Sequence, residues 1–255
     1  MPHDSIHLLS NYYNFALSKA TYRYAVKIDD DQIYFTQQCK NIFDLYRTSE
    51  KVEITYKEKL YYAYFRKLQK LCSSQESVLF QLLRHNLPSH FFQTVRRYLE
   101  KRIQNDKICI SLSGINIFEN KITLGQATDG TLPPFNGVHD TIIFPISETT
   151  YYVPQYDKPQ NRIIEHFHIL HKYWGFGFFW LHLKDMKPYI REKKSHLYKD
   201  ILIEIDSFLD EDFFAFHKKK RYYLAKHMKF LYYFYLKSDM EYIRKELHRI
   251  ISLLE

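Results

Sequence analysis

Glycine and proline are scarce in this chain of 255 residues, with 6 and 8 copies, and they are unevenly placed. All the glycines lie between Gly114 and Gly177, and every proline except Pro2 and Pro88 lies beyond residue 132 and before residue 189. Both residues punctuate turns and disfavour the interior of helices. Their distribution therefore predicts two helical ends and a non-helical middle.

Long apolar runs are also missing. The longest run, residues 176–183, is interrupted by His182, whereas a bilayer span needs about 20 apolar residues. The N-terminal sequence has no basic segment ahead of an apolar one, which a secretory signal would have. The cysteines are odd in number and scattered: Cys39, Cys72 and Cys109. We therefore expect no membrane insertion, no disulfide framework and a cytoplasmic location.

Several short motifs that mark enzyme classes are absent. The chain contains no Gly-x-Gly-x-x-Gly, no P-loop, no Gly-x-Ser-x-Gly and no Cys-x-x-Cys. These absences argue against dinucleotide-binding enzymes, P-loop ATPases, α/β-hydrolases and thiolate zinc sites.

What the chain has in abundance is aromatic residues and positive charge. Hydrophobic residues make up 45% of the sequence and aromatic residues 18%, which is enough to build a packed core. Lysine and arginine number 37 against 29 aspartates and glutamates, a net charge of +8. This excess favours anionic partners such as nucleic acid, without specifying one.

Residues 1–105 are predicted to form an N-terminal helical region. An aromatic-rich segment over 5–26 ends near Asp29, a helix over about 32–47 follows, and residues 77–83 continue as helix. Two further segments have apolar residues every three or four positions, the spacing of one helix face. The first contains Leu60, Tyr64, Leu68 and Leu71. In the second, after Pro88, the residues Phe91, Val95 and Tyr98, followed by Arg102, resume the helical spacing.

Residues 106–157 change to the period of two that is typical of strands. Ile108, Ile110 and Leu112 alternate with smaller residues, and isoleucines on both sides flank a short turn at Glu119-Asn120. Residues 141–146 and 149–153 are further strand candidates. We predict a small antiparallel sheet here.

Residues 158–255 return to helical spacing and are predicted to form a C-terminal helical bundle, which can belong to one domain with residues 1–105. Four apolar stripes support this prediction: Ile163, Phe167, Leu170 and Trp174; Leu197, Ile201, Ile205 and Phe208; Met228, Leu231 and Tyr235; and Ile243, Leu247, Ile250 and Leu254. The predicted fold class is therefore α+β, mainly α-helical, with two helical regions flanking a small antiparallel β-sheet.

Two runs of like charge lie in the C-terminal region. The acidic run contains Asp200, Glu204, Asp206, Asp210, Glu211 and Asp212, and the basic run contains Lys218, Lys219, Lys220, Arg221, Lys226 and Lys229. They can be the complementary surfaces of two neighbouring helices. Alternatively, the basic run binds the phosphates of a nucleic acid while Tyr222 stacks on a base. It could also lie on an anionic membrane surface.

Four histidines cluster along the chain at His166, His168, His171 and His182. Glu165 and His168 have the Glu-x-x-His spacing of di-iron bundles, but the chain has no second copy. On a helix, His166 and His168 would point about 200° apart and could not share a metal ion. Asp129 and Asp140 lack the following acidic-x-Lys pattern of a metal nuclease. We therefore predict no metal site and no cofactor.

The segment Leu82-Leu83-Arg84-His85-Asn86-Leu87-Pro88-Ser89-His90 is the best candidate for catalysis. An arginine can hold a phosphate with two hydrogen bonds, and a histidine can move protons near neutral pH. Together they could cleave RNA without a metal, with the ribose 2′-hydroxyl as nucleophile.

This segment resembles the motif of the HEPN superfamily of helical-bundle proteins, whose ribonuclease members carry Arg, a polar residue, a few residues and then His. The resemblance implies an RNA endonuclease whose two motifs meet across a dimer, with a role in antiviral defence or in a toxin–antitoxin system. It implies that Arg84 stabilises the phosphate, that His90 handles the proton, and that His85 or Asn86 orients them.

Two other functions stay open. The chain could be a non-enzymatic basic subunit of a larger nucleic-acid-associated assembly, which needs no catalytic motif. It could also be a metal-dependent nuclease. The expected partners are RNA or another nucleic acid, with a protein partner or a second copy of the chain in addition.

Overall fold

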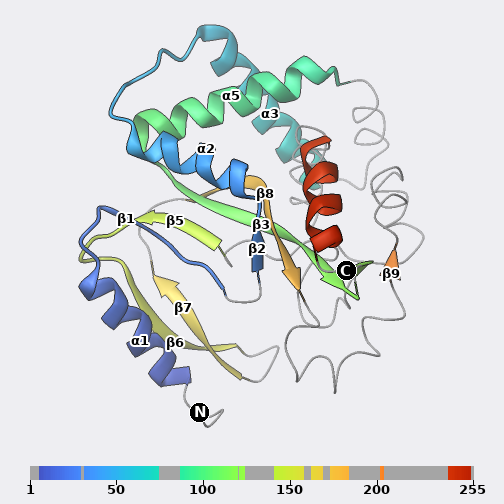
Figure 1. Cartoon of the computed structure of the whole chain (residues 1–255). Helices are drawn as coiled ribbons and strands as arrows, with labels where there is room; N and C mark the ends of the chain where they lie inside the picture. Colours follow the sequence, from blue (N-terminus) through green and yellow to red (C-terminus); the bar gives the residue numbers. More distant parts are fainter. Residues whose placement is uncertain are drawn as a thin grey trace.

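The computed structural model describes residues 6–29, 32–74, 87–119, 121–123, 141–157, 162–168, 173–183, 202–203 and 241–253. The helices are α1 (Ile6–Lys19), α2 (Thr36–Arg47), α3 (Tyr56–Ser74), α5 (Ser89–Asp106) and a C-terminal helix over 241–253. The strands are β1 (Tyr24–Val26), β2 (Gln32–Tyr34), β3 (Cys109–Phe118), β4 (Lys121–Thr123), β5 (Thr141–Pro145), β6 (Tyr151–Asp157), β7 (Arg162–His168), β8 (Tyr173–Leu183) and β9 (Leu202–Ile203). The fold class is α+β, as the sequence predicts (Figure 1).

Strand β3 is the centre of the larger sheet. Along one edge it pairs with β8 in parallel, and along the other edge it pairs antiparallel with β5 and then, across the turn at Glu119, with β4. Strand β2 extends the sheet beyond β8, β1 extends it beyond β5, and β9 pairs with β4. The predicted hairpin at Glu119 and the predicted strands over 141–146 and 149–153 are confirmed. The sheet is mixed, however, because its central pair is parallel.

The prediction of helix after residue 158 is wrong for the segments that form β7, β8 and β9. Apolar residues four positions apart, such as Ile163 and Phe167, fit a helix face but occur in strands as well. The segment Tyr173–Leu183 is almost continuously apolar, as a strand buried on both faces is, and periodicity alone cannot distinguish that pattern from a buried helix. Its pairing with β3, more than 60 residues earlier, decides in favour of a strand.

The N-terminal helices are shorter than the sequence predicts. Helix α1 ends at Lys19 and α2 begins at Thr36, and the two short strands β1 and β2 lie between them. These strands add to opposite sides of the sheet by pairing with β5 and β8, so tertiary pairing overrides local helix propensity. The helices predicted after Pro88 and at residues 243–250 are confirmed. The helical segments predicted at 77–83 and 228–235 lie outside the described residues.

One face of the sheet is covered by α2, α3, α5 and the C-terminal helix (Figure 1). They enclose the main hydrophobic core, in which Phe35, Val95, Ile103, Ile110 and Leu247 are fully buried. Burial of this apolar area is the main contribution to the stability of the fold. None of the helices that the structure describes is long and apolar enough to cross a membrane.

The opposite face is covered at one end by α1 and the hairpin of β6 and β7. Here Cys109 and Phe144 form a second, smaller buried cluster, against which Leu17 and Phe167 pack. Asn14 of α1 joins the hairpin directly, because its side chain donates to the backbone carbonyl of Tyr152 and accepts from the Tyr152 amide, at 2.8 and 2.7 Å.

The pairing of β3 with β8 is irregular in the middle of β3, and β3 faces the helices on both sides of this irregularity. Ile110 and Leu112 belong to the main core, and so do Ile115 and Ile117, although the two pairs have opposite parity in the sequence. The register against β8 shifts between residues 111 and 114. The extra residues at this irregularity lie on β8, where residues 175–180 stand opposite residues 111–114 of β3. Both halves of β3 nevertheless contribute to the same core.

Candidate nucleic-acid interface

Of the predicted catalytic residues, the structure describes His90. Arg84, His85 and Asn86 lie outside the described residues, and so does the whole predicted nucleic-acid-binding run: Lys218, Lys219, Lys220, Arg221, Tyr222, Lys226 and Lys229. Pro88 occupies the N-cap position of α5 in extended backbone, so His90 lies in the first turn of a new helix. The segment from Arg84 to His90 is therefore interrupted by Pro88 rather than carried on one continuous helix.

His90 is exposed and lies beside a tyrosine of α3. Its Nε2 atom is 3.2 Å from the hydroxyl oxygen of Tyr61, and the two ring centroids are 6.0 Å apart. The Lys57 ammonium lies 5.8 Å from the centre of the same tyrosine ring. Tyr61 therefore contacts an imidazole at the start of α5 through its hydroxyl, and an ammonium group lies near its ring.

Helix α3 presents apolar side chains to solvent as well as to the core. Phe65 and Leu68 are buried, whereas Tyr56 is 79%, Leu60 54%, Tyr64 47% and Leu71 50% exposed. The stripe predicted from Leu60, Tyr64, Leu68 and Leu71 is thus helical, but most of it points away from the core. At 100° per residue, Tyr56, Leu60, Tyr64 and Leu71 fall within an arc of about 80°.

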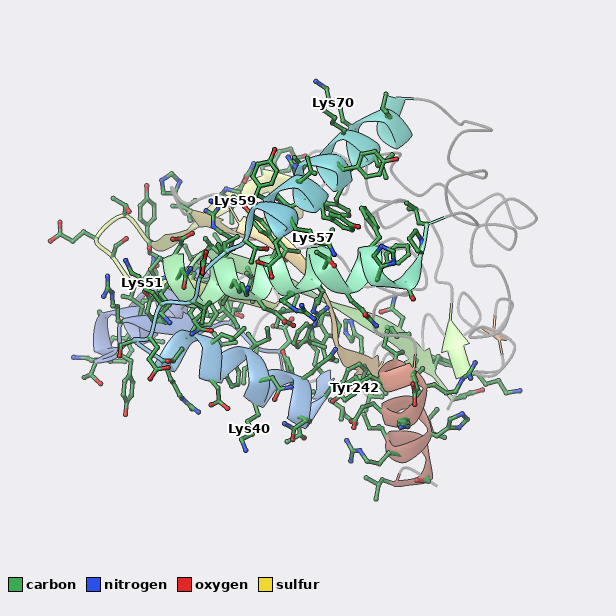
Figure 2. All side chains as sticks on the ribbon, turned by 90° about the horizontal axis from the view of Figure 1, so that it is seen from above. Lys40, Lys51, Lys57, Lys59, Lys70 and Tyr242 are labelled. Atoms are coloured by element: carbon green, nitrogen blue, oxygen red, sulfur yellow. The ribbon has the colours of Figure 1, made fainter. Side chains whose placement is uncertain are left out.

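Basic side chains border this stripe. Lys59, Arg66 and Lys70 are on one side, Lys67 lies within it and Lys57 is on the other side, and all five residues are exposed. Figure 2 shows Lys59 and Lys70 on one side of α3 and Lys57 on the side toward α5, with Lys51 on the segment that precedes the helix. We call the set of ten exposed positions the α3 outer face: Tyr56, Lys57, Lys59, Leu60, Ala63, Tyr64, Arg66, Lys67, Lys70 and Leu71.

The single acidic residue of α3, Glu58, is kept out of this face. It is 4% exposed, and its carboxylate lies 2.8 Å from the ammonium of Lys101 on α5. Its carboxylate also accepts hydrogen bonds from the backbone amide and the hydroxyl of Thr55, while the Glu58 amide donates to the Thr55 hydroxyl, which makes a capping box at the start of α3. The α3 outer face therefore carries lysine and arginine side chains and no acidic residue.

The environment of Glu58 changes its acidity in a definite direction. Burial alone would raise the pKa of the carboxyl, but the hydrogen bonds from Lys101 and Thr55, together with the charge of Lys101, outweigh burial and lower the pKa below its ordinary value. Glu58 is thus an anion at neutral pH, and its charge is paired with Lys101 rather than with a lysine or arginine of the α3 outer face.

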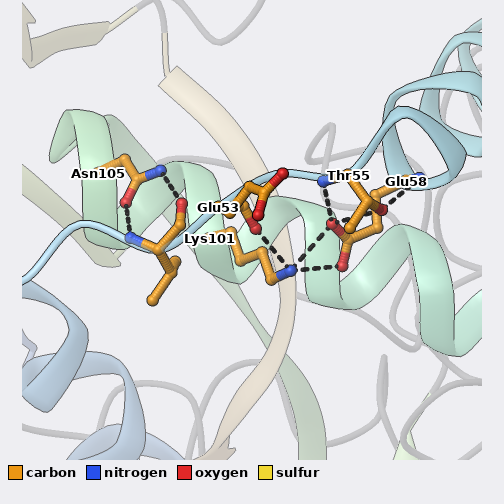
Figure 3. A network of polar contacts seen from close by, with 6 residues as sticks. Glu53, Thr55, Glu58, Lys101 and Asn105 are labelled. Carbon is orange, nitrogen blue, oxygen red and sulfur yellow. Dashed lines mark hydrogen bonds and ion pairs between the residues drawn. The ribbon is translucent and has the colours of Figure 1, made fainter.

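Helix α5 fixes the orientation of α3 by holding the segment before it (Figure 3). Lys101 donates to the carbonyl of Glu53 at 2.8 Å, and Asn105 bonds both the amide and the carbonyl of Val52, at 2.8 and 2.7 Å. Further along, the rings of Tyr62 and Tyr98 stack with their centroids 4.4 Å apart. His90 and the α3 outer face are therefore parts of one rigid pair of helices.

A second polar feature, inside the sheet, was not identified as a site from the sequence. His182 of β8 is paired in register with Asn116 of β3 and Gln32 of β2, and all three are buried. The row lies near the carboxyl ends of the parallel pair, where open α/β sheets place ligands. The signal available in the sequence was His182 itself, the residue that interrupts the longest apolar run.

The described residues contain no group of three histidine, cysteine, aspartate or glutamate side chains arranged to hold a metal ion. Cys39 and Cys109 are buried free thiols, and burial raises the pKa of each to about 12, so neither is a thiolate at neutral pH. His166 and His168 lie on strand β7, which corrects the helical placement predicted for them, and His171 lies outside the described residues.

No family model, no curated protein and no solved structure matches this chain. A proposal about its function must therefore be argued from the site. The fold and the surface define an α+β protein with a mixed sheet and one basic, tyrosine-bearing helix face.

Proposed function

We propose that the protein binds RNA through the α3 outer face, with His90 at its border, as a basic subunit of a nucleic-acid-associated assembly. The proposal is based on the composition of that face. It has five exposed lysine and arginine side chains and two exposed tyrosines, and the one acidic residue of the helix, Glu58, is buried against Lys101. Lysine and arginine side chains neutralise phosphates, and tyrosine rings stack on unpaired nucleobases.

The exposed rings favour RNA with unpaired bases over a membrane as the partner. An exposed aromatic ring can stack on the flat face of a nucleobase, and each such stack contributes about 1–3 kcal/mol to the free energy of binding. Tyr56 and Tyr64 lie two helical turns apart, so each can meet a different base, while Lys59 and Lys67 reach the backbone between them. A helix that lies on a membrane would need a wider apolar face than this stripe offers.

The test removes charge from the face without reversing it. We expect the triple variant Lys57→Gln, Lys59→Gln and Lys67→Gln to bind single-stranded RNA at least about tenfold more weakly at low salt. The slope of log affinity against log salt should fall by about 2, because each lost phosphate contact on a single strand contributes about 0.7. Fluorescence anisotropy of labelled RNA at several salt concentrations measures both quantities.

The matched control removes three exposed lysines elsewhere: Lys19 of α1, Lys40 of α2 and Lys245 of the C-terminal helix. This triple has the same net charge, so it separates a local site from general attraction to a basic protein, and its affinity should stay within about twofold. Equal loss in the two triples would reject the α3 outer face as the site. Binding to phosphatidylserine vesicles without binding to RNA would assign the face to a membrane.

The HEPN-type ribonuclease is a second candidate function, favoured by the exposed His90 in the first turn of α5 at the border of the same face. In that reaction His90 would take the proton of the ribose 2′-hydroxyl, or protonate the leaving oxygen, and Arg84 would stabilise the phosphate. Tyr61, whose hydroxyl is 3.2 Å from Nε2, would orient the ring.

Labelled single-stranded RNA, incubated with and without EDTA, tests this second candidate. Cleavage that survives EDTA and disappears in His90→Ala and in Arg84→Ala, with RNA binding retained, would support it. Cleavage abolished by EDTA would indicate a metal-dependent nuclease instead. Reversing the charge of Lys218–Arg221 tests the predicted basic run: weaker RNA binding with a smaller salt slope would support that assignment.

A further inference from the structure

Strand β7 places His166 and His168 on the same side of the β6–β7 hairpin. Successive residues of a strand alternate between its faces, so residues two apart share a face and lie about 6.6 Å apart along the strand. Phe167, between them, packs inward against Phe144, with ring centroids 4.5 Å apart. The two histidines therefore belong to the outward face, on which a helix could not have placed both.

The outward face leaves both imidazoles accessible. His166 is exposed, and His168 is half-buried beneath Tyr151, its cross-strand partner, with ring centroids 4.6 Å apart and planes inclined by 26°. Stacking of this kind covers the flat side of an imidazole. A metal ion binds a ring nitrogen at the edge, in the plane of the ring, so the tyrosine fixes the orientation of His168 without blocking its nitrogens.

The hairpin is a firm support for such a pair. Its strands pair over seven consecutive positions, from Tyr151 with His168 to Asp157 with Arg162. On the inward face Tyr152 contacts both Phe167 and Tyr13, with centroids 4.8 and 4.6 Å apart. The Cβ atoms of His166 and His168 are thus held in place before any metal ion binds, which lowers the conformational entropy lost on binding.

We propose that His166 and His168 form a two-imidazole site for a divalent transition-metal ion that is intermediate between hard and soft ions, with Cu²⁺ bound most tightly. Imidazole is a preferred ligand of Zn²⁺, Ni²⁺ and Cu²⁺, and affinity for a given nitrogen site rises to Cu²⁺ in this series. Two neighbouring nitrogens fill adjacent corners of the square coordination that Cu²⁺ adopts. Because no third protein donor joins them in the described part of the chain, the other corners are open to water or an external ligand.

The test uses the whole chain, stripped of metal and titrated with Cu²⁺ in competition with a chelator of known affinity. We expect His166→Gln and His168→Gln each to weaken the tightest site at least about tenfold. In the electron paramagnetic resonance spectrum, the number of nitrogen ligands should fall from two to one in each variant. The chain has 13 histidines, so His248→Gln, which alters an exposed histidine of the C-terminal helix, is the matched control and should leave the tightest site unchanged.

Circular dichroism of each variant shows whether the fold is retained, since outward residues on a hairpin should tolerate glutamine. If the two β7 variants bind Cu²⁺ like the His248→Gln control, or if the wild-type spectrum shows fewer than two nitrogens at one equivalent, the site does not exist. Neither result bears on RNA binding, because β7 is not part of the α3 outer face.

Discussion

Gly114 and Trp180 illustrate how single residues control the centre of the sheet. They are paired in register across the parallel strands β3 and β8, and Trp180 is fully buried. The indole lies directly over the Gly114 backbone, where a Cβ atom would overlap the six-membered part of the ring. Glycine is required here for close approach rather than for an unusual backbone angle.

We therefore expect Gly114→Ala to destabilise the protein by about 1–3 kcal/mol or more, since a buried indole has no room to move aside. Urea unfolding followed by tryptophan fluorescence measures the change. A double variant with Trp180→Leu should lose less than the sum of the two single variants, because the smaller side chain removes the overlap. An unchanged unfolding midpoint in Gly114→Ala would show that the two strands can separate without cost.

At the scale of elements, α5 organises the helical layer. Its side chains reach the backbone of the segment that joins α2 to α3: Lys101 to Glu53, Gln104 to Glu50 and Asn105 to Val52. The ion pair of Lys101 with Glu58 adds a link to α3 itself. The same buried pair that fixes α3 also removes the one acid from its outer face, so structure and proposed function depend on one interaction.

Glu58→Gln should cost about 1–3 kcal/mol at neutral pH, the usual range for a buried group that loses a charged hydrogen-bond partner. Because folding lowers the pKa of Glu58, its stabilisation is complete above the ordinary glutamate pKa of about 4.3 and is lost as the pH falls through the folded-state value. The difference between wild type and variant should thus be largest at neutral pH and shrink below about pH 4.

Urea unfolding between pH 7 and pH 3 checks this dependence. Glu241→Gln is the control, since Glu241 is 85% exposed and its pair with Lys245 lies on the surface; a surface pair should contribute little. A Glu58→Gln difference that stays constant across the pH range would mean that the carboxylate charge is not what stabilises the start of α3.

At the scale of the whole molecule, two layers of unequal strength lie on opposite faces of the sheet. The helical layer of α2, α3, α5 and the C-terminal helix encloses the main core. Helix α1 and the β6–β7 hairpin pack on the other face over the small cluster of Cys109 and Phe144. Less apolar area is buried there, so less free energy holds that layer in place.

Local opening should follow this inequality. Native-state hydrogen exchange in low denaturant should show amides of α1, β6 and β7 exchanging at a lower free energy than amides of β3 and α5. Phe167→Ala should widen the gap, because it removes a ring shared by the hairpin and Phe144. Exchange of both layers at one common free energy would indicate a single cooperative unit instead.

Local patterns predicted the elements whose stability is local. The spacing of Phe91, Val95 and Tyr98 predicted α5, and the alternation around Glu119 predicted the β3–β4 hairpin, because neighbouring residues alone form these contacts. The same reasoning was wrong for β7 and β8, where Ile163, Phe167 and Trp174 have helix-like spacing. Of the candidate site, the sequence identified His90. It noted His166 and His168 but predicted no metal site there, because it placed them on a helix. It missed the α3 outer face, since an apolar stripe alone does not show whether it faces the core.

The sequence by itself determined the α+β class, the positive charge and the main helices, because composition and short-range periodicity are properties of the chain before it folds. The tertiary structure decided the rest. It decided that β3 and β8 pair in parallel, that His166 and His168 share a face and that Glu58 meets Lys101 while the bases of α3 face water. Each of these outcomes depends on contacts between residues far apart in the chain, and their free energy exists only once the sheet and its helices have come together.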